Sequence, residues 1–70
     1  MTVNELKNAI RLQGKVEIVR FDEETGEAVT HFRTYDFDAE PIPAELLDNT
    51  IVAMYGVADE EAAGIMIEIE

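Results

Sequence analysis

The chain contains no cysteine, no serine and no tryptophan. Without cysteine, neither a disulfide framework nor a thiolate zinc site can hold the domain together. The same absences remove the serine and cysteine nucleophiles on which much covalent catalysis depends. No apolar run approaches the roughly 18 residues of a membrane span, and no signal-peptide pattern opens the sequence. We therefore expect a soluble, cytoplasmic protein with no membrane partner.

Basic residues are missing from the second half of the chain. From Thr34 to Glu70 there are ten acidic residues and no lysine or arginine, whereas the first 33 residues carry all five basic residues beside six acidic ones. Nearly all of the formal net charge of −11 therefore lies in the second half. Such a chain repels nucleic acid and anionic membrane surfaces. We expect no direct nucleic-acid binding, and a protein partner with a basic surface is the natural complement.

Hydrophobic residues make up 47% of the 70 residues. This content is too high for a disordered acidic tail, which combines high charge with low hydrophobicity. The length suits one small folded unit and no more. We therefore expect a single acidic domain over residues 1–70.

The opening segment has the signals of a capped helix. Thr2 and Glu5 have the spacing of a capping box, in which each side chain accepts a hydrogen bond from the other residue's backbone N–H. Apolar residues then recur at helical spacing, and Gly14 is placed to end the helix in a left-handed conformation. These signals predict a helix from Val3 to Gln13.

Four later segments have the composition of β-strands: 15–21, 28–35, 50–57 and 65–70. Asp22–Glu27 has the composition of a hairpin loop in which Gly26 takes positive φ. Pro43 suits the first position of a short helix over residues 43–48. Because residues 50–57 are apolar almost without a break, we expect that strand to lie inside the sheet and to be covered on both faces.

This order of elements predicts an α+β domain, in which the N-terminal helix packs on a four-stranded antiparallel sheet. A simple meander is the first choice of strand order. One helix covers only part of such a sheet, and two of the predicted strands are apolar on both sides. The second sheet face is therefore expected either to be closed by the short helix or to keep an exposed apolar patch, which would be a candidate for a homodimer contact.

Three carboxylates occur at alternate positions before the first proline: Asp36, Asp38 and Glu40. A calcium-binding loop begins in the same way, but Pro41 stands where glycine is needed and Leu47 stands where the bidentate glutamate should be. We therefore expect no metal site here. The carboxylates could instead form a recognition surface with Phe37 as an apolar anchor between them.

Nothing in the sequence has the spacing of a catalytic centre. The single histidine, His31, has no neighbouring nucleophile, orienting acid or second metal ligand that spacing alone identifies. The four glycines form no phosphate-binding loop, and a domain of this size has little room for a substrate pocket. We expect no enzymatic activity, no catalytic residue and no cofactor.

We therefore expect a non-enzymatic acidic protein-interaction domain or adaptor. The candidate partner-binding residues are Asp36, Phe37, Asp38, Glu40, Asp59, Glu60 and Glu61. Two alternatives stay open: an accessory subunit of a larger assembly, and an acidic inhibitor that imitates nucleic acid and occupies the basic channel of a DNA- or RNA-binding protein. A mimic predicts acidic residues gathered on one surface, whereas an adaptor predicts acidic residues scattered around an apolar patch.

The opening Met1–Leu6, followed by a hairpin whose turn reads Asp–x–x–Thr–Gly–Glu, resembles small uncharacterised proteins of bacterial phages and conjugative elements. The resemblance covers residues 1–27 and brings no functional residue with it. Such elements often encode acidic anti-defence proteins, so the resemblance implies the inhibitor alternative.

Overall fold

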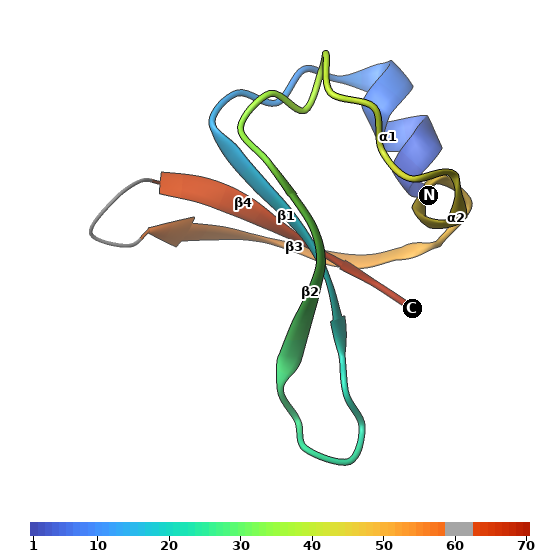
Figure 1. The fold of residues 1–70 in the computed structure, drawn as a ribbon, viewed down its shortest axis with the longest axis vertical. Coiled ribbons are helices and arrows are strands. Elements are labelled where there is room, and N and C mark those ends of the chain that lie inside the picture. Colours follow the sequence, from blue (N-terminus) through green and yellow to red (C-terminus); the bar gives the residue numbers. More distant parts are fainter. Residues whose placement is uncertain (59–62) are drawn as a thin grey trace.

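The computed structural model describes residues 1–58 and 63–70, and it has α+β architecture (Figure 1). The elements in chain order are α1 (Val3–Ala9), β1 (Lys15–Phe21), β2 (Ala28–Thr34), α2 (Ala44–Leu47), β3 (Ile51–Ala58) and β4 (Ala63–Ile69). The predicted class and element order are therefore confirmed. In this part of the chain, neither helix is long and apolar enough to cross a membrane.

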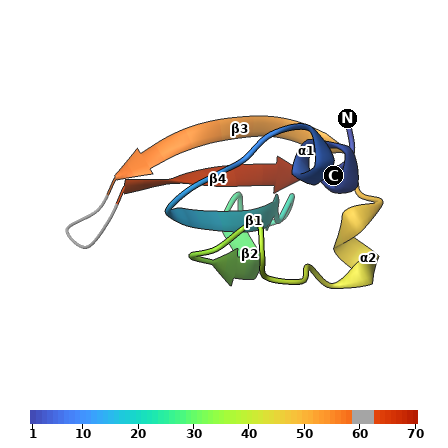
Figure 2. The ribbon, with the colours of Figure 1, turned by 90° about the horizontal axis from the view of Figure 1, so that it is seen from above.

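The four strands form one mixed sheet in the order β2-β1-β4-β3. β1 pairs with β2 and β3 pairs with β4 in antiparallel fashion, whereas β1 and β4 run parallel (Figure 2). The predicted antiparallel sheet and its meander order are therefore wrong. Two antiparallel pairs lie side by side with their inner strands parallel. Parallel neighbours need a long connection, which here consists of β2, the following loop, α2 and β3.

β3 lies at an edge of the sheet, so the prediction that it would be an interior strand is wrong. The interior positions belong to β1 and β4, and the first five residues of β1 are buried. β3 is an uncharged apolar run, whereas β1 also carries three charged residues. The branched side chains of β1, Val16, Ile18 and Val19, are nevertheless all fully buried. β3 instead spaces its branched residues with alanine, methionine and glycine. Burial of apolar area stabilises the fold. Placing β1 rather than β3 at the centre of the sheet therefore buries more apolar area and stabilises the fold more.

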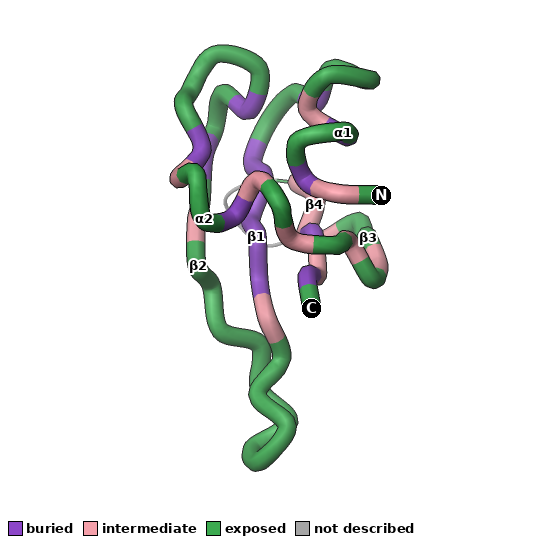
Figure 3. The backbone as a smooth tube through the Cα atoms, turned by 90° about the vertical axis from the view of Figure 1, so that its right-hand side faces the viewer, coloured by how far each residue is buried: buried purple, intermediate pink, exposed green. Residues whose placement is uncertain are grey.

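Both helices pack on the same face of the sheet. α1 contributes Val3 and Leu6, and α2 contributes Leu46, to one core cluster with the inward side chains of the central strands. The remaining buried members of this cluster are Leu12, Val16, Ile18, Phe37, Ile42, Ile67 and Ile69. The buried stretches of the backbone accordingly follow β1 and the helix segments that face it (Figure 3). The core is one thin layer between the sheet and the helices.

The capping box at the start of α1 is confirmed. The Glu5 N–H donates to Thr2 Oγ1 and the Thr2 N–H donates to Glu5 Oε1, each at 3.1 Å. The backbone hydrogen bond from Thr2 lowers the pKa of the Glu5 carboxyl, and the Thr2 hydroxyl lowers it further. Because this pKa is lowered in the folded state, the stabilisation from Glu5 is present above its unfolded pKa and is lost as the pH falls.

The helix is shorter than predicted. It ends at Ala9, because Ile10 is extended with φ −139° and ψ 164°. Beyond the helix, Ile10 is exposed and Leu12 is buried in the core. Gly14 has the expected positive φ of 87°, but there it turns the chain into β1 rather than capping α1. Gly26 in the hairpin loop likewise takes positive φ, as predicted.

Gly64 in β4 provides a test of the parallel pairing. A Cβ built on Gly64 would lie 2.9 Å from the Lys15 Cβ and closer still to the Lys15 carbonyl oxygen on β1. Gly56 in β3 has nothing within 4 Å of the same position. We expect Gly64→Ala to lower the free energy of unfolding by about 1–3 kcal/mol, the usual effect of overpacking. Gly56→Ala should leave it unchanged or raise it by about 0.5 kcal/mol. Urea denaturation followed by circular dichroism measures both, and equal effects of the two substitutions would contradict the β1–β4 contact.

Candidate protein-interaction site

The loop after β2 holds the first predicted recognition residues, and Asp36 has a structural role within it. The Asp36 N–H donates to Thr34 Oγ1 at 2.9 Å. Asp36 Oδ1 accepts from the Ala39 N–H at 3.3 Å, and the Asp36 carbonyl oxygen accepts from the Glu40 N–H at 2.9 Å. Asp36 therefore closes a turn, as aspartate often does where its side chain can bond the backbone ahead.

Phe37 is fully buried in the core, so its predicted role as an exposed anchor is wrong. The turn closed by Asp36 directs Phe37 inward, and Tyr35 is the exposed aromatic residue of this loop. Lys7 of α1 binds this loop through two hydrogen bonds. Its Nζ donates to the Phe37 carbonyl at 2.7 Å and to the Glu40 carbonyl at 3.1 Å. The same Nζ lies 5.3 Å from the centroid of the Phe37 ring, a cation–π contact.

Two of the remaining carboxylates of the predicted set lie among the described residues. Asp38 and Glu40 are exposed, while Asp59, Glu60 and Glu61 lie outside the described residues. A second acidic group occupies the hairpin loop, residues 22–27, at the opposite end of β2 from Asp36 (Figure 1). The seven residues of β2 span about 20 Å. These two acidic loops of the described chain thus lie at opposite ends of β2.

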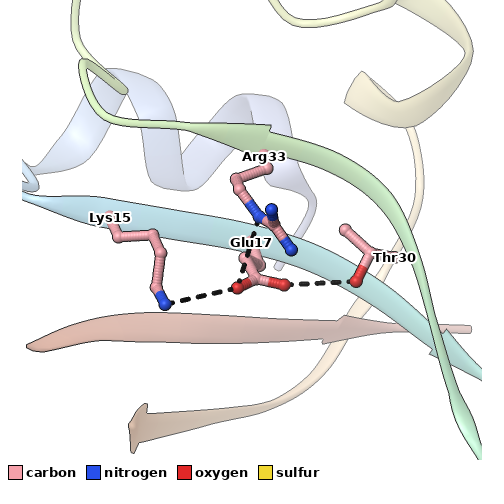
Figure 4. Close-up of polar contacts among 4 residues, drawn as sticks. All are labelled: Lys15, Glu17, Thr30 and Arg33. Atoms are coloured by element: carbon pink, nitrogen blue, oxygen red, sulfur yellow. Dashed lines mark hydrogen bonds and ion pairs between the residues drawn. The ribbon is translucent and has the colours of Figure 1, made fainter. Parts of the chain in front are cut away.

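A buried charged cluster occupies the sheet face opposite the helices (Figure 4). Glu17 is only 7% exposed, and its Oε1 lies 3.7 Å from Lys15 Nζ and 3.5 Å from Arg33 Nε. The Thr30 hydroxyl donates to Glu17 Oε2 at 3.1 Å. The carboxylate is therefore compensated on both oxygens. This compensation is what makes the burial of a charge tolerable.

The expected closure of the second face by the short helix is therefore wrong, because α2 packs on the same face as α1. At β1 the second face carries paired charges rather than the alternative, an exposed apolar patch. Alternation along β1 places Lys15, Glu17 and Val19 on this face, so paired charges precede the buried valine. Sequence reasoning missed this cluster. The available signal was the pair of charged residues at alternate positions of a strand that is otherwise apolar.

Three of the large exposed apolar side chains lie on β3. Val52, Met54 and Tyr55 are 55%, 41% and 38% exposed, although all three lie within a strand. The Tyr55 hydroxyl donates to Glu68 Oε1 on the neighbouring β4. This bond to a carboxylate raises the pKa of Tyr55 above its usual value. Because the raised pKa belongs to the folded state, the bond stabilises the fold at neutral pH, and this contribution is lost above about pH 10.

The N-terminus pairs with the beginning of β3. Thr2 and Thr50 form an antiparallel bridge. The Val3 N–H donates to the Asn49 carbonyl at 3.1 Å, and the Ile51 N–H donates to the Met1 carbonyl at 2.7 Å. The outer edge of β3 is thus covered at its first residue, and among the described residues no strand pairs with that edge from Val52 onward.

His31 lies at one of the surface hollows of the described chain. His31 is exposed and lines a shallow hollow with Arg20, Phe21, Asp22 and Val29. No group of three or more histidine, aspartate or glutamate side chains in the described ranges could hold a metal ion.

Asp36 and Asp38 lie two residues apart in the same loop, and we expect them to contribute differently to the free energy of unfolding. Asp36→Ala removes the side-chain hydrogen bond to Ala39, so we expect the free energy of unfolding to fall by about 1 kcal/mol. Asp38→Ala removes an exposed carboxylate and should change it by less than about 0.5 kcal/mol. Thermal denaturation of the two variants at one ionic strength checks this difference. Equal melting temperatures would remove the structural role assigned to Asp36.

No protein-family model matches the chain, and neither the curated proteins nor the solved structures include a significant match. The resemblance of residues 1–27 to small proteins of phages and conjugative elements therefore stays a prediction.

Proposed function

We propose that this chain is a non-enzymatic acidic protein-interaction domain. The observation that carries the proposal is the exposure of Val52, Met54 and Tyr55 together on one edge strand of a highly charged domain. Met54 and Tyr55 lie on opposite faces of β3, so each side of this edge presents an exposed apolar side chain to a segment that covers it. A partner covering these side chains would gain the free energy of removing their apolar area from water.

The placement of the acidic residues favours this proposal over the nucleic-acid mimic. A mimic needs its carboxylates on one surface, spaced to meet a continuous basic channel. In the described chain, the hairpin loop and the Asp36–Glu40 loop lie at opposite ends of β2, about 20 Å apart. Acidic residues at separate ends are better suited to solubility and to attracting a basic partner from a distance.

Glu17, the one deeply buried carboxylate among residues 1–58 and 63–70, also supports a structural rather than a catalytic role. A general base must reach the proton that it removes. Glu17 already has Lys15 and Arg33 beside one oxygen and the Thr30 hydroxyl on the other. This arrangement neutralises the charge within the sheet.

Affinity capture from a bacterial lysate tests the proposal. The immobilised wild-type protein is compared with a Val52→Glu/Met54→Glu variant, whose changes lie on exposed positions of β3. Washes span salt from about 0.05 to 0.5 M, a range over which exposed charge interactions are screened. We expect a protein bound by the wild type to be retained in part at high salt, to resist added DNA and to be lost with the variant.

Two outcomes would contradict the proposal. Capture of nucleic-acid-binding proteins that salt releases completely and DNA displaces would favour the mimic instead. Equal capture by the wild type and the variant would show that the exposed residues of β3 are not the contact surface.

A further inference from the structure

We infer that β3 binds an extended segment of a partner protein, apolar at its centre and flanked by lysine or arginine, which adds antiparallel beside residues 52–58 as a fifth strand. This inference rests on the proposed function and specifies the site and the chemistry of the partner. Addition of a strand to a sheet edge is a known mode of peptide recognition, in which main-chain hydrogen bonds provide affinity and alternate side chains provide specificity.

The two edges of the sheet differ in protection. Natural edge strands are usually shielded by charged side chains, proline or bulges. β2 carries Arg33 and His31, and its pairing with β1 is interrupted by a bulge in mid-strand. β3 has neither charge nor proline in its eight residues, and its single irregularity lies at its start, between Ile51 and Ala53. From Ala53 to Ala58 it pairs with β4 without interruption, so this stretch is a regular, uncharged edge.

The beginning of the same edge already binds a strand in the folded protein. Met1–Val3 pairs antiparallel with Asn49–Ile51 through two backbone hydrogen bonds of 3.1 and 2.7 Å. At the first residue of β3, the backbone N–H that points away from β4 is therefore oriented for antiparallel pairing. A partner segment that begins beside Val52 would extend this pairing along the same edge of β3, beyond the residues that the N-terminus covers.

Side chains on both faces of β3 are available to such a segment. Met54 pairs with Ile67 and so lies on the helix-bearing face, whereas Tyr55 pairs with Met66 and lies on the opposite face. Both are partly exposed. An added strand would place successive side chains next to each of them in turn. An apolar centre in the partner segment fits both positions.

Charge selects a basic partner over a second copy of this chain. The half of the sequence that contains β3 and β4 carries ten acidic residues and no basic one. Glu68 lies beside Tyr55 on β4, and the exposed Asp48 and Glu70 lie near the beginning of β3. Pairing β3 with itself would bring two such halves together, and like charges in proximity cost free energy. Lysine or arginine next to an apolar segment would instead be attracted to the acidic residues beside the beginning of β3.

A displayed library of random dodecapeptides, selected on the immobilised full chain, tests the inference. We expect enriched peptides with alternating apolar residues at the centre, lysine or arginine on the flanks and no central proline. One enriched peptide is then synthesised and titrated into ¹⁵N-labelled protein. The largest changes in NMR chemical shift should be those of the backbone amides of residues 52–58.

Paired substitutions of opposite charge separate the proposed contact from a general surface effect. Met54→Lys and Met54→Glu remove the same apolar side chain, but only the lysine repels a basic peptide. We expect the lysine variant to bind the peptide roughly tenfold more weakly than the glutamate variant, in line with the reversal of one nearby charge. Val29 on β2 has comparable exposure at the other edge, so the same two changes there should leave binding within about twofold. Circular dichroism confirms that each variant is folded.

Each contrary outcome overturns the inference. Enrichment of acidic or proline-rich peptides, or of no peptide beyond a bare-support control, would exclude a basic strand as the occupant. Peptides whose binding depends on Val29 rather than Met54 would move the site to the other edge, while leaving the proposed interaction function intact. A concentration-dependent dimer in sedimentation that both Met54 variants dissociate would identify a second copy as the occupant of β3.

Discussion

The parallel pairing of β1 with β4 is the contact on which the rest of the structure depends. It joins two antiparallel strand pairs into one sheet and places Val16, Ile18 and Ile67 together beneath the helices. The pairing requires close approach of the two backbones, which Gly64 allows because it has no side chain to meet Lys15. The outer strands, β2 and β3, then become edges by consequence, and their different protection follows from their own sequences.

The two faces of this sheet are closed by different means. On one face, a thin helical layer buries apolar side chains, and the loop around Phe37 is fastened to α1 by Lys7. On the other face, Glu17 is held between basic side chains and a threonine hydroxyl, so charge is buried in a compensated form. Among the described residues, the uncharged edge of β3 is the surface that we propose for a partner.

Local signals in the sequence predicted most of the elements, because each depends on few neighbouring residues. The capping box at Thr2 and the positive φ of Gly26 are of this kind. Strand order is different, because it depends on how much apolar area each strand buries once packed, and the unbroken apolarity of β3 did not predict its edge position. Phe37 was misassigned for a related reason. Its alternation with carboxylates is typical of an exposed strand, but the turn that Asp36 closes directs the Phe37 side chain into the core. The Glu17 cluster arises from residues on two strands, whose register no local pattern predicts.

Hydrogen exchange of the backbone amides in the free protein tests the central claim most directly. If β1 and β4 form the centre and β3 presents an open edge, the amides of β1 and β4 exchange slowest. Within β3, beyond Ile51, amides bonded to β4 should be protected, and those facing outward should exchange close to the rate of an unstructured chain. Uniform protection along β3 in the monomer would show that its edge is covered, and would contradict both the described edge and its proposed role.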